Sequence, residues 1–237
     1  MDIQLTWSKA MKQFTTIVLV LAATLLTSFK SNANEIYITQ SGDNLDLEVT
    51  QKSEDQYVSL SSTGANNDIT IRQGIHSDGT YDGDETGGHE AYWTVNGSGN
   101  TVYSYQTDTN RGGGGGAPHH LANIIDGDGN FVKHTQMGKA GHDGFVEIDG
   151  DDNFVDLYQR GNGGAKWADI VLTGDGHTVD VDQRGSNSAS AAIDLTNSGG
   201  AYTLDLDQNV TTSADSYSIT GICSTFGGCS VTVNRNN

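Results

Sequence analysis

The sequence contains little proline, little cysteine and little positive charge. One proline and two cysteines occur in 237 residues, and 12 lysines and arginines stand against 30 aspartates and glutamates. The low proline content suits continuous strand pairing, which proline would interrupt. The net charge of −18 argues against nucleic acids and anionic membranes as partners. Helical periodicity is missing after the N-terminal region, so we expect an all-β fold.

The sequence also lacks the motifs of common enzyme classes. It has no HExxH zinc motif, nucleophile elbow or dinucleotide fingerprint, and the glycine run 112–116 is not followed by the Lys-Ser/Thr of a phosphate loop. Carboxylates are so abundant that a pair of them could resemble a glycosidase site by chance. We therefore expect no catalytic residues and no enzymatic activity.

One apolar run lies near the N-terminus. Met11-Lys12, the apolar run Ile17–Leu26 and Ser31-Asn32-Ala33 have the order of a secretory signal peptide with cleavage after Ala33. The alternative is a membrane anchor, although the run is short for the ~20 residues that a span needs. We expect residues 1–33 to be a signal peptide, with Met11 as an alternative start, and residues 34–237 to be the secreted protein. The mature part then has 9 basic and 29 acidic residues and a net charge of −20.

A repeated pattern fills most of the remaining chain. The pattern occurs seven times. Each copy begins with a glycine; after two further residues comes a position that is usually asparagine, then alternating apolar residues, and then a glutamine nine positions after the glycine, as in Gly64-x-x-Asn67-x-Ile69-x-Ile71-x-Gln73. Residues two apart share one face of a strand, so the asparagine, the apolar residues and the glutamine would face inward together. A second strand in the same phase precedes each glycine, for example Val58-x-Leu60.

This periodicity predicts a β-solenoid of about eight stacked strand-turn-strand repeats. A single unit cannot bury its apolar face, whereas stacked units can, because each strand pairs with the same strand of the next repeat at about 4.8 Å. Two insertions, 74–90 and 107–120, fall at the same corner of the unit, and we interpret them as surface loops.

The recurring amides are predicted to form ladders along the stack. Buried amides are costly unless they are hydrogen bonded, and stacked identical amides can satisfy one another. The alternative is that these residues only end the strands. The expected self-assembly ladder comprises Gln51, Asn67, Gln73, Asn100, Gln106, Asn130, Gln136, Asn153, Gln159, Gln183 and Gln208.

The pattern resembles the curlin repeat of bacterial curli fibres, which has the form Gln-x-Gly-x-x-Asn-x-Ala/Val-x-x-x-Gln. Gln40-Ser41-Gly42 supplies even the leading glutamine in the first unit. The resemblance implies a subunit that is exported through the periplasm and polymerises into a cross-β, amyloid-type fibre at the cell surface, for adhesion and for the biofilm matrix. Its implied partners are copies of itself and curli-type secretion and nucleation proteins. The alternative is a monomeric secreted β-solenoid that binds divalent cations or glycans.

The two cysteines lie close to the C-terminus. Cys223 and Cys229 flank five residues between Tyr217-x-Ile219 and Val231-x-Val233. We expect the last unit to be a hairpin closed by a Cys223–Cys229 disulfide, since export exposes the chain to an oxidising compartment. A free thiol pair or a metal pair is the alternative. Arg235 stands at the position of the repeat glutamine, so this eighth unit is degenerate.

Two groups of side chains are candidates for a metal site, although we expect no cofactor with the possible exception of Ca²⁺. Asp156, Asp180 and Asp205 share one outward position of the repeat and would form a column, with repulsion that a cation could relieve. His76 and His89 flank several carboxylates of the first insertion and could bind a divalent ion, although a solvated loop is the plainer interpretation.

Overall fold

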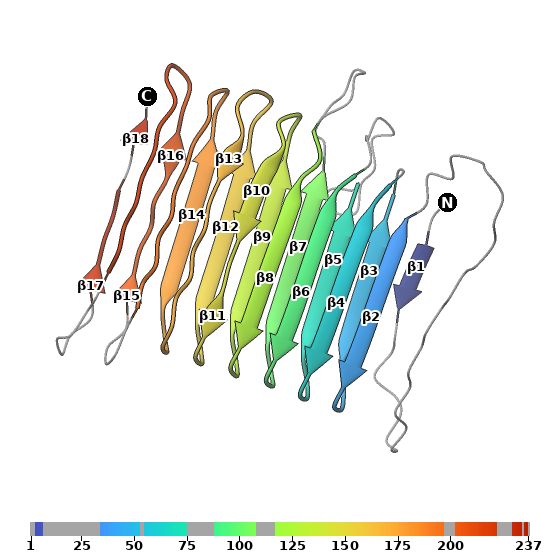
Figure 1. The fold of residues 1–237 in the computed structure, drawn as a ribbon. Helices are drawn as coiled ribbons and strands as arrows, with labels where there is room; N and C mark the ends of the chain where they lie inside the picture. Colours follow the sequence, from blue (N-terminus) through green and yellow to red (C-terminus); the bar gives the residue numbers. More distant parts are fainter. Residues whose placement is uncertain are drawn as a thin grey trace.

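The computed structural model describes residues 3–6, 34–52, 55–74, 88–107, 117–196, 202–221, 229–233 and 235–236. Within these ranges every regular element is a β-strand, and the strands form two sheets (Figure 1). Sheet A contains β1 (Ile3–Thr6), β3 (Asp46–Gln51), β5 (Asp68–Gln73), β7 (Thr101–Thr107), β9 (Phe131–Met137), β12 (Phe154–Arg160), β14 (Thr178–Arg184), β15 (Tyr202–Thr203), β16 (Gln208–Asn209), β17 (Cys229–Ser230) and β18 (Arg235–Asn236). Sheet B contains β2 (Glu35–Ser41), β4 (Tyr57–Thr63), β6 (Glu90–Asn96), β8 (His120–Asp126), β10 (His142–Phe145), β11 (Ile148–Asp149) and β13 (Lys166–Trp167).

Each repeat contributes one segment to each sheet, and successive repeats pair in parallel. In sheet A, β12 lies between β9 and β14, and Gln159 is in register with Gln136 and Gln183. In sheet B, β2, β4, β6 and β8 pair in the same way. The strands lie side by side along one axis (Figure 1). The structure thus confirms the all-β fold and the β-solenoid of stacked repeats.

The core lies between the two sheets and follows the period of two in the sequence. Val155 and Leu157 of β12 point inward and are fully buried, as are Ile148 and Ile170 from the facing side. The intervening residues of β12, including Asp156 and Tyr158, lie on the outer face. Burial of one such aliphatic side chain stabilises the fold by roughly 1.5–3 kcal/mol. Five of the seven glutamine-bearing sheet A segments add such an aliphatic pair, and in β7 and β9 the buried Ser104 and His134 take the second inward position. The core therefore continues along the stack.

The glycine that opens each repeat is required by the stacking of backbones. Gly97, Gly127 and Gly150 have φ angles of 127°, 140° and 145°, which L side chains rarely adopt. A Cβ on Gly127 would lie 2.0 Å from the carbonyl oxygen of Gly150 in the next repeat. The turn therefore excludes any side chain at this position, for both conformational and steric reasons.

We expect Gly127→Ala to destabilise the protein far more than Gly176→Ala. Gly176 also has a positive φ, of 70°, but a Cβ there would meet nothing within 4 Å. The control therefore carries only the backbone cost of about 1–2 kcal/mol, whereas Gly127→Ala adds a clash worth about 1–3 kcal/mol more. Denaturant unfolding of the two variants measures the difference. Equal losses of unfolding free energy in the two variants would show that the contact with the Gly150 carbonyl adds nothing to the cost.

The two predicted insertions connect the same edges of the two sheets. One lies between the end of β5 and the start of β6, and the other between the end of β7 and the start of β8. Residues 75–87 and 108–116 are outside the described residues. The flanking segments 88–90 and 117–120 belong to the regular stack, so both insertions are shorter than the sequence suggested.

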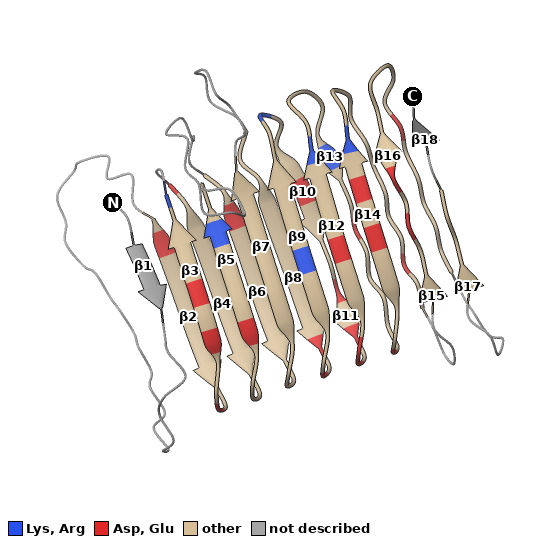
Figure 2. Cartoon of the chain, turned by 180° about the vertical axis from the view of Figure 1, so that it is seen from behind, with Lys and Arg blue, Asp and Glu red and all other residues tan. Residues whose placement is uncertain are grey.

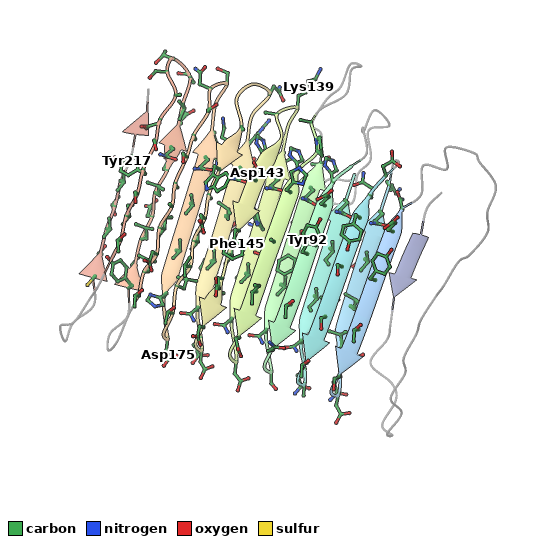
Figure 3. All side chains as sticks on the ribbon, viewed as in Figure 1. Tyr92, Lys139, Asp143, Phe145, Asp175 and Tyr217 are labelled. Atoms are coloured by element: carbon green, nitrogen blue, oxygen red, sulfur yellow. The ribbon has the colours of Figure 1, made fainter. Side chains whose placement is uncertain are left out.

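The prediction of a C-terminal hairpin is wrong for the described residues. The Ile219 amide donates to the Ala192 carbonyl on the sheet B side, whereas β17 pairs in parallel with β15 of sheet A. Each half of the last unit therefore stacks on the preceding unit, because its alternating apolar residues extend the same core. Tyr217 of this unit is labelled in Figure 3. Cys223 lies outside the described residues, so the disulfide with Cys229 stays a prediction.

The N-terminal strand β1 departs from the parallel pattern. It pairs antiparallel with β3, with Ile3 opposite Gln51. Residues 7–33 lie outside the described residues, and the signal peptide with cleavage after Ala33 stays a prediction. No helix in the part of the chain that the structure describes is long and apolar enough to cross a membrane.

Candidate functional site

The repeat glutamines form one continuous ladder of side-chain hydrogen bonds. The Nε2 atom of each glutamine donates to the Oε1 atom of the next, at 2.8–3.0 Å, and all seven side chains are fully buried. The ladder runs in chain order through Gln51, Gln73, Gln106, Gln136, Gln159, Gln183 and Gln208. Satisfied amides of this kind favour one register, since a shift by one residue would leave them unpaired inside the core.

The same glutamines tie the two sheets together at one corner. Gln106 Nε2 donates also to the backbone carbonyl of Glu90, at 2.8 Å, and Gln159 Nε2 donates to that of Asp143, at 3.0 Å. These carbonyls belong to sheet B strands, whereas the glutamines end sheet A strands. Each rung therefore links its own repeat across the corner and links it to the next repeat along the stack.

The asparagines form a second column, but not by the pairing expected from the sequence. The Asn100 backbone N–H donates to Asn67 Oδ1 at 3.0 Å, and Asn67 Nδ2 donates to the Gly97 carbonyl at 2.9 Å. Asn100, Asn130 and Asn153 repeat the two bonds. The amides thus bond to the backbone of the next repeat rather than to each other, because the short side chain lies beside the turn of the next repeat.

A column of histidines lies at the corner opposite the asparagines and was missed by the sequence reasoning. His89, His119 and His142 are buried and stacked, with ring centroids 4.7 and 4.8 Å apart. The His119 and His142 backbone N–H groups donate to Nδ1 of the preceding imidazole, at 3.1 and 3.2 Å. This bond has the same pattern as in the asparagine column, with Nδ1 in the place of Oδ1.

The accepting Nδ1 atoms require neutral imidazoles. His142 Nε2 lies 3.0 Å from the Met137 carbonyl, so its proton is on Nε2. Burial lowers the pKa of His142 to about 4, and burial together with its two histidine neighbours lowers the pKa of His119 well below its ordinary value. Lys166 follows in register after His142; burial lowers its pKa to about 8, and its ammonium donates to the carbonyls of Gly164 and Asn187.

The three aspartates proposed as a cation site share one position on the outer face of sheet A. Asp156 is in register with Asp180, and the Leu206 amide donates to the Asp180 carbonyl, so Asp205 is the next residue of the column. Lys133 Nζ lies 2.8 Å from Asp156 and neutralises one end. Figure 2 shows a basic segment on β9 beside acidic segments on β12 and β14. Burial, followed by repulsion from Asp156 and Asp205, raises the pKa of Asp180.

The histidines proposed for metal binding are not brought to this column. His89 is stacked in the buried histidine column, and His76 lies outside the described residues. Among the residues that can be described, no group of three or more histidines, cysteines, aspartates and glutamates is placed to hold a metal ion. Binding of Ca²⁺ by the aspartate column therefore stays a prediction that repulsion alone supports.

One protein-family model matches a part of the chain that contributes to the glutamine ladder and the asparagine column. The model described as the curlin associated repeat matches residues 150–185. This segment is similar to the curlin repeat. It contains β12 and β14, two rungs of the glutamine ladder and Asn153 of the asparagine column. The match confirms the resemblance to the curlin family for these units. The search of curated proteins and the search of solved structures gave no match.

The curlin repeat segment also carries two of the three aspartates, which allows a direct test. We expect Ca²⁺ to accelerate assembly of the wild-type chain, and we expect replacement of Asp156, Asp180 and Asp205 with asparagine to reduce that acceleration at matched ionic strength. Two like charges about 5 Å apart repel by about 1 kcal/mol in water, so the response should fall about fivefold. The measurement is the assembly half-time with and without Ca²⁺. Equal responses of both proteins would assign the effect to the net charge of −20 of the chain 34–237 rather than to this column.

Proposed function

We propose that the exported chain is a structural subunit that stacks end to end into an extracellular cross-β fibre. The curlin repeat belongs to a structural, non-enzymatic family, which supports a structural role over a catalytic one. Surface adhesion and the building of a biofilm matrix are the roles that such a fibre would have. Secretion and nucleation proteins of the curli type would be its partners during export and assembly.

The observation that carries this proposal is the continuity of the stack up to its ends. From β2 and β3 onward the strands of both sheets pair in parallel and in register, and within the described ranges β2 pairs with a strand on one side only. It has seven residues and no proline that would block pairing. Natural proteins usually protect such edges, because exposed edges recruit further strands. An open edge at the end of a repeating stack therefore supports growth by strand addition.

The proposal is tested by incubating the purified chain 34–237 and following fibre formation. Electron microscopy, an amyloid dye and fibre diffraction with a meridional spacing of about 4.8 Å should all report cross-β fibres. A chain that stays monomeric at high concentration over days, under conditions in which it is folded, would contradict the fibre proposal.

A second candidate function, binding of extended glycans, is favoured by aromatic side chains on the outer face of sheet A. The rings of Tyr103, Phe131 and Phe154 follow one another along the stack, with centroids 5.8 and 4.9 Å apart. Phe154 is 38% exposed. Aromatic rings that follow one another on an outer face can pack against sugar rings. Co-sedimentation with insoluble polysaccharides, lost on replacing Phe131 and Phe154 with serine, would support this function.

A further inference from the structure

Three tyrosines from consecutive repeats lie in contact on the outer face of sheet B. The ring of Tyr57 on β4 lies between those of Tyr37 on β2 and Tyr92 on β6, with centroids 5.7 and 5.3 Å apart and the rings edge to face. Ser59 is in register with both Tyr37 and Tyr92, so a small side chain separates them. Tyr37 is 57% exposed and Tyr92, labelled in Figure 3, is 41% exposed. The phenols are therefore close to one another and open to reagents in solution.

Two of these phenols have a carboxylate as hydrogen-bond acceptor. The Tyr92 hydroxyl donates to Glu90 Oε2 at 2.8 Å, and the Tyr37 hydroxyl donates to Glu35 Oε2 at 3.2 Å. The bond to Glu35 raises the pKa of Tyr37, and partial burial together with the bond to Glu90 raises the pKa of Tyr92 to about 12. Both phenols thus keep their proton at neutral pH and have a base within proton-transfer distance. Glu90 Oε2 also lies 3.1 Å from His120 Nδ1.

This arrangement suits one-electron oxidation of the phenol. A phenol that loses an electron becomes a strong acid, so its oxidation is easiest where a base takes the proton at the same time. Glu90 is placed to do so for Tyr92. The unpaired electron of the resulting tyrosyl radical is shared with the ortho carbons of the ring, where two radicals combine. Rings that the fold already holds in contact combine far more readily than rings that must meet by diffusion.

We propose that Tyr57 and Tyr92 are an oxidative modification site, at which a dityrosine bond joins two neighbouring repeats and Glu90 accepts the proton of Tyr92. The oxidant is hydrogen peroxide acting through a peroxidase. It takes one electron and one proton from each phenol and is reduced to two water molecules. The two radicals form one carbon–carbon bond between ortho carbons, and each ortho hydrogen then moves to its phenol oxygen, which restores both rings. Rotation of the exposed side chains brings the two carbons together.

The geometry favours this pair over Tyr37 and Tyr57. The centroids of Tyr57 and Tyr92 are 5.3 Å apart rather than 5.7 Å, and the phenol–carboxylate bond is 2.8 Å rather than 3.2 Å. The bond would also have the larger effect on stability. It would join β4 to β6 on the two sides of the first insertion, at residues 35 positions apart. As with a disulfide that closes a loop of this size, the unfolding equilibrium constant should fall roughly a hundredfold.

Oxidation of the purified full chain at low concentration, with hydrogen peroxide and a peroxidase, tests the site. We expect a product of monomer size that has lost two hydrogen atoms, shows dityrosine fluorescence and gives a cross-linked Tyr57–Tyr92 peptide after proteolysis. Tyr57→Phe and Tyr92→Phe each keep a ring and remove one phenol, so each should lose this peptide. In the control Tyr158→Phe the phenol removed donates to Met137 Sδ on the outer face of sheet A, and the product should be unchanged.

A further variant tests the carboxylate. Glu90→Gln keeps an acceptor for the Tyr92 hydroxyl but is not a base, so the initial rate of cross-linking should fall at least about tenfold while denaturant unfolding of the unoxidised protein changes little. Equal rates in this variant and the wild type would overturn the role given to Glu90. A link found only between separate chains, or a link between other tyrosines while Tyr57 and Tyr92 stay unmodified, would overturn the site. The expected product is that of a monomer, so it is the same whether or not the chain forms fibres.

Discussion

Replacing Gln159 and Gln183 together with alanine should slow fibre growth by orders of magnitude while the chain is still exported. The double change removes two adjacent rungs of the ladder and leaves Gln208 Oε1 without its donor. The sheet B carbonyls of Asp143 and Trp167 lose donors as well. Each unsatisfied buried group costs about 1–3 kcal/mol, and the two cavities add to this. Dye-monitored kinetics and quantification of the exported protein measure the two effects.

The matched control uses the neighbouring residues of the same strands. Arg160 and Arg184 directly follow the two glutamines, and both side chains are exposed on the outer face. Replacing these two arginines with alanine should change the elongation rate only slightly, since exposed ion pairs contribute little. A Gln159→Met and Gln183→Met variant keeps most of the volume, so it separates the lost hydrogen bonds from the cavities. Wild-type kinetics in the alanine variant would contradict a structural role of the ladder.

The fold could be predicted from the sequence because its determinants recur at fixed spacing. The nine-residue distance from glycine to glutamine and the period of two between them place Asn153, Val155, Leu157 and Gln159 on one face of a strand. The structure has all four buried on that face, in register with the next repeat. One repeat alone would be ambiguous, but seven copies have a common solution only as a stack.

The remaining features depend on contacts between repeats that have no fixed spacing. The histidines of the buried column lie 16, 13 and 6 residues after their repeat glutamines, because the insertions differ in length. Their alignment appears only in the register of sheet B, in which Glu90, His120 and Asp143, the residues that follow the three histidines, lie opposite one another. The position of the neighbouring repeat also decides two other features. One is that the asparagine amides bond to the backbone rather than to each other, and the other is that the last unit stacks on the preceding one instead of forming a hairpin.

Lowering the pH from 7.5 to 5 should destabilise the folded protein through its buried imidazoles. Burial lowers the pKa of His134 to about 3 and that of His142 to about 4, and the pKa of His119 also lies well below its ordinary value. The unfolded chain takes up protons near pH 6.5, and the folded chain does not. This stability is therefore complete above pH 6.5 and is lost as the pH falls toward the folded pKa values.

The expected loss at pH 5 is about 2 kcal/mol each for His134 and His142, since one pKa unit corresponds to 1.36 kcal/mol, and His119 adds a loss in the same direction. Other charged groups near the column change this little. Lys166 has a pKa of about 8 and is mostly protonated between pH 7.5 and 5. Asp180 acts in the opposite direction, because its raised pKa means that protonation favours the folded stack. Denaturant unfolding at several pH values measures the sum.

The asparagine column suggests a variant that separates two effects of acid, the loss of stability through the buried histidines and the gain in assembly through the aspartate column. Asparagine Oδ1 accepts the backbone N–H of the next repeat in the same way as histidine Nδ1 does. Replacing His89, His119 and His142 with asparagine should therefore keep the bonds and remove most of the acid sensitivity, leaving that of His134. Acid should then speed assembly of this variant through the aspartate column, whereas wild-type assembly should pass through a maximum as the fold weakens. If variant and wild type lose the same stability between pH 7.5 and 5, the histidine column is not the source of the loss.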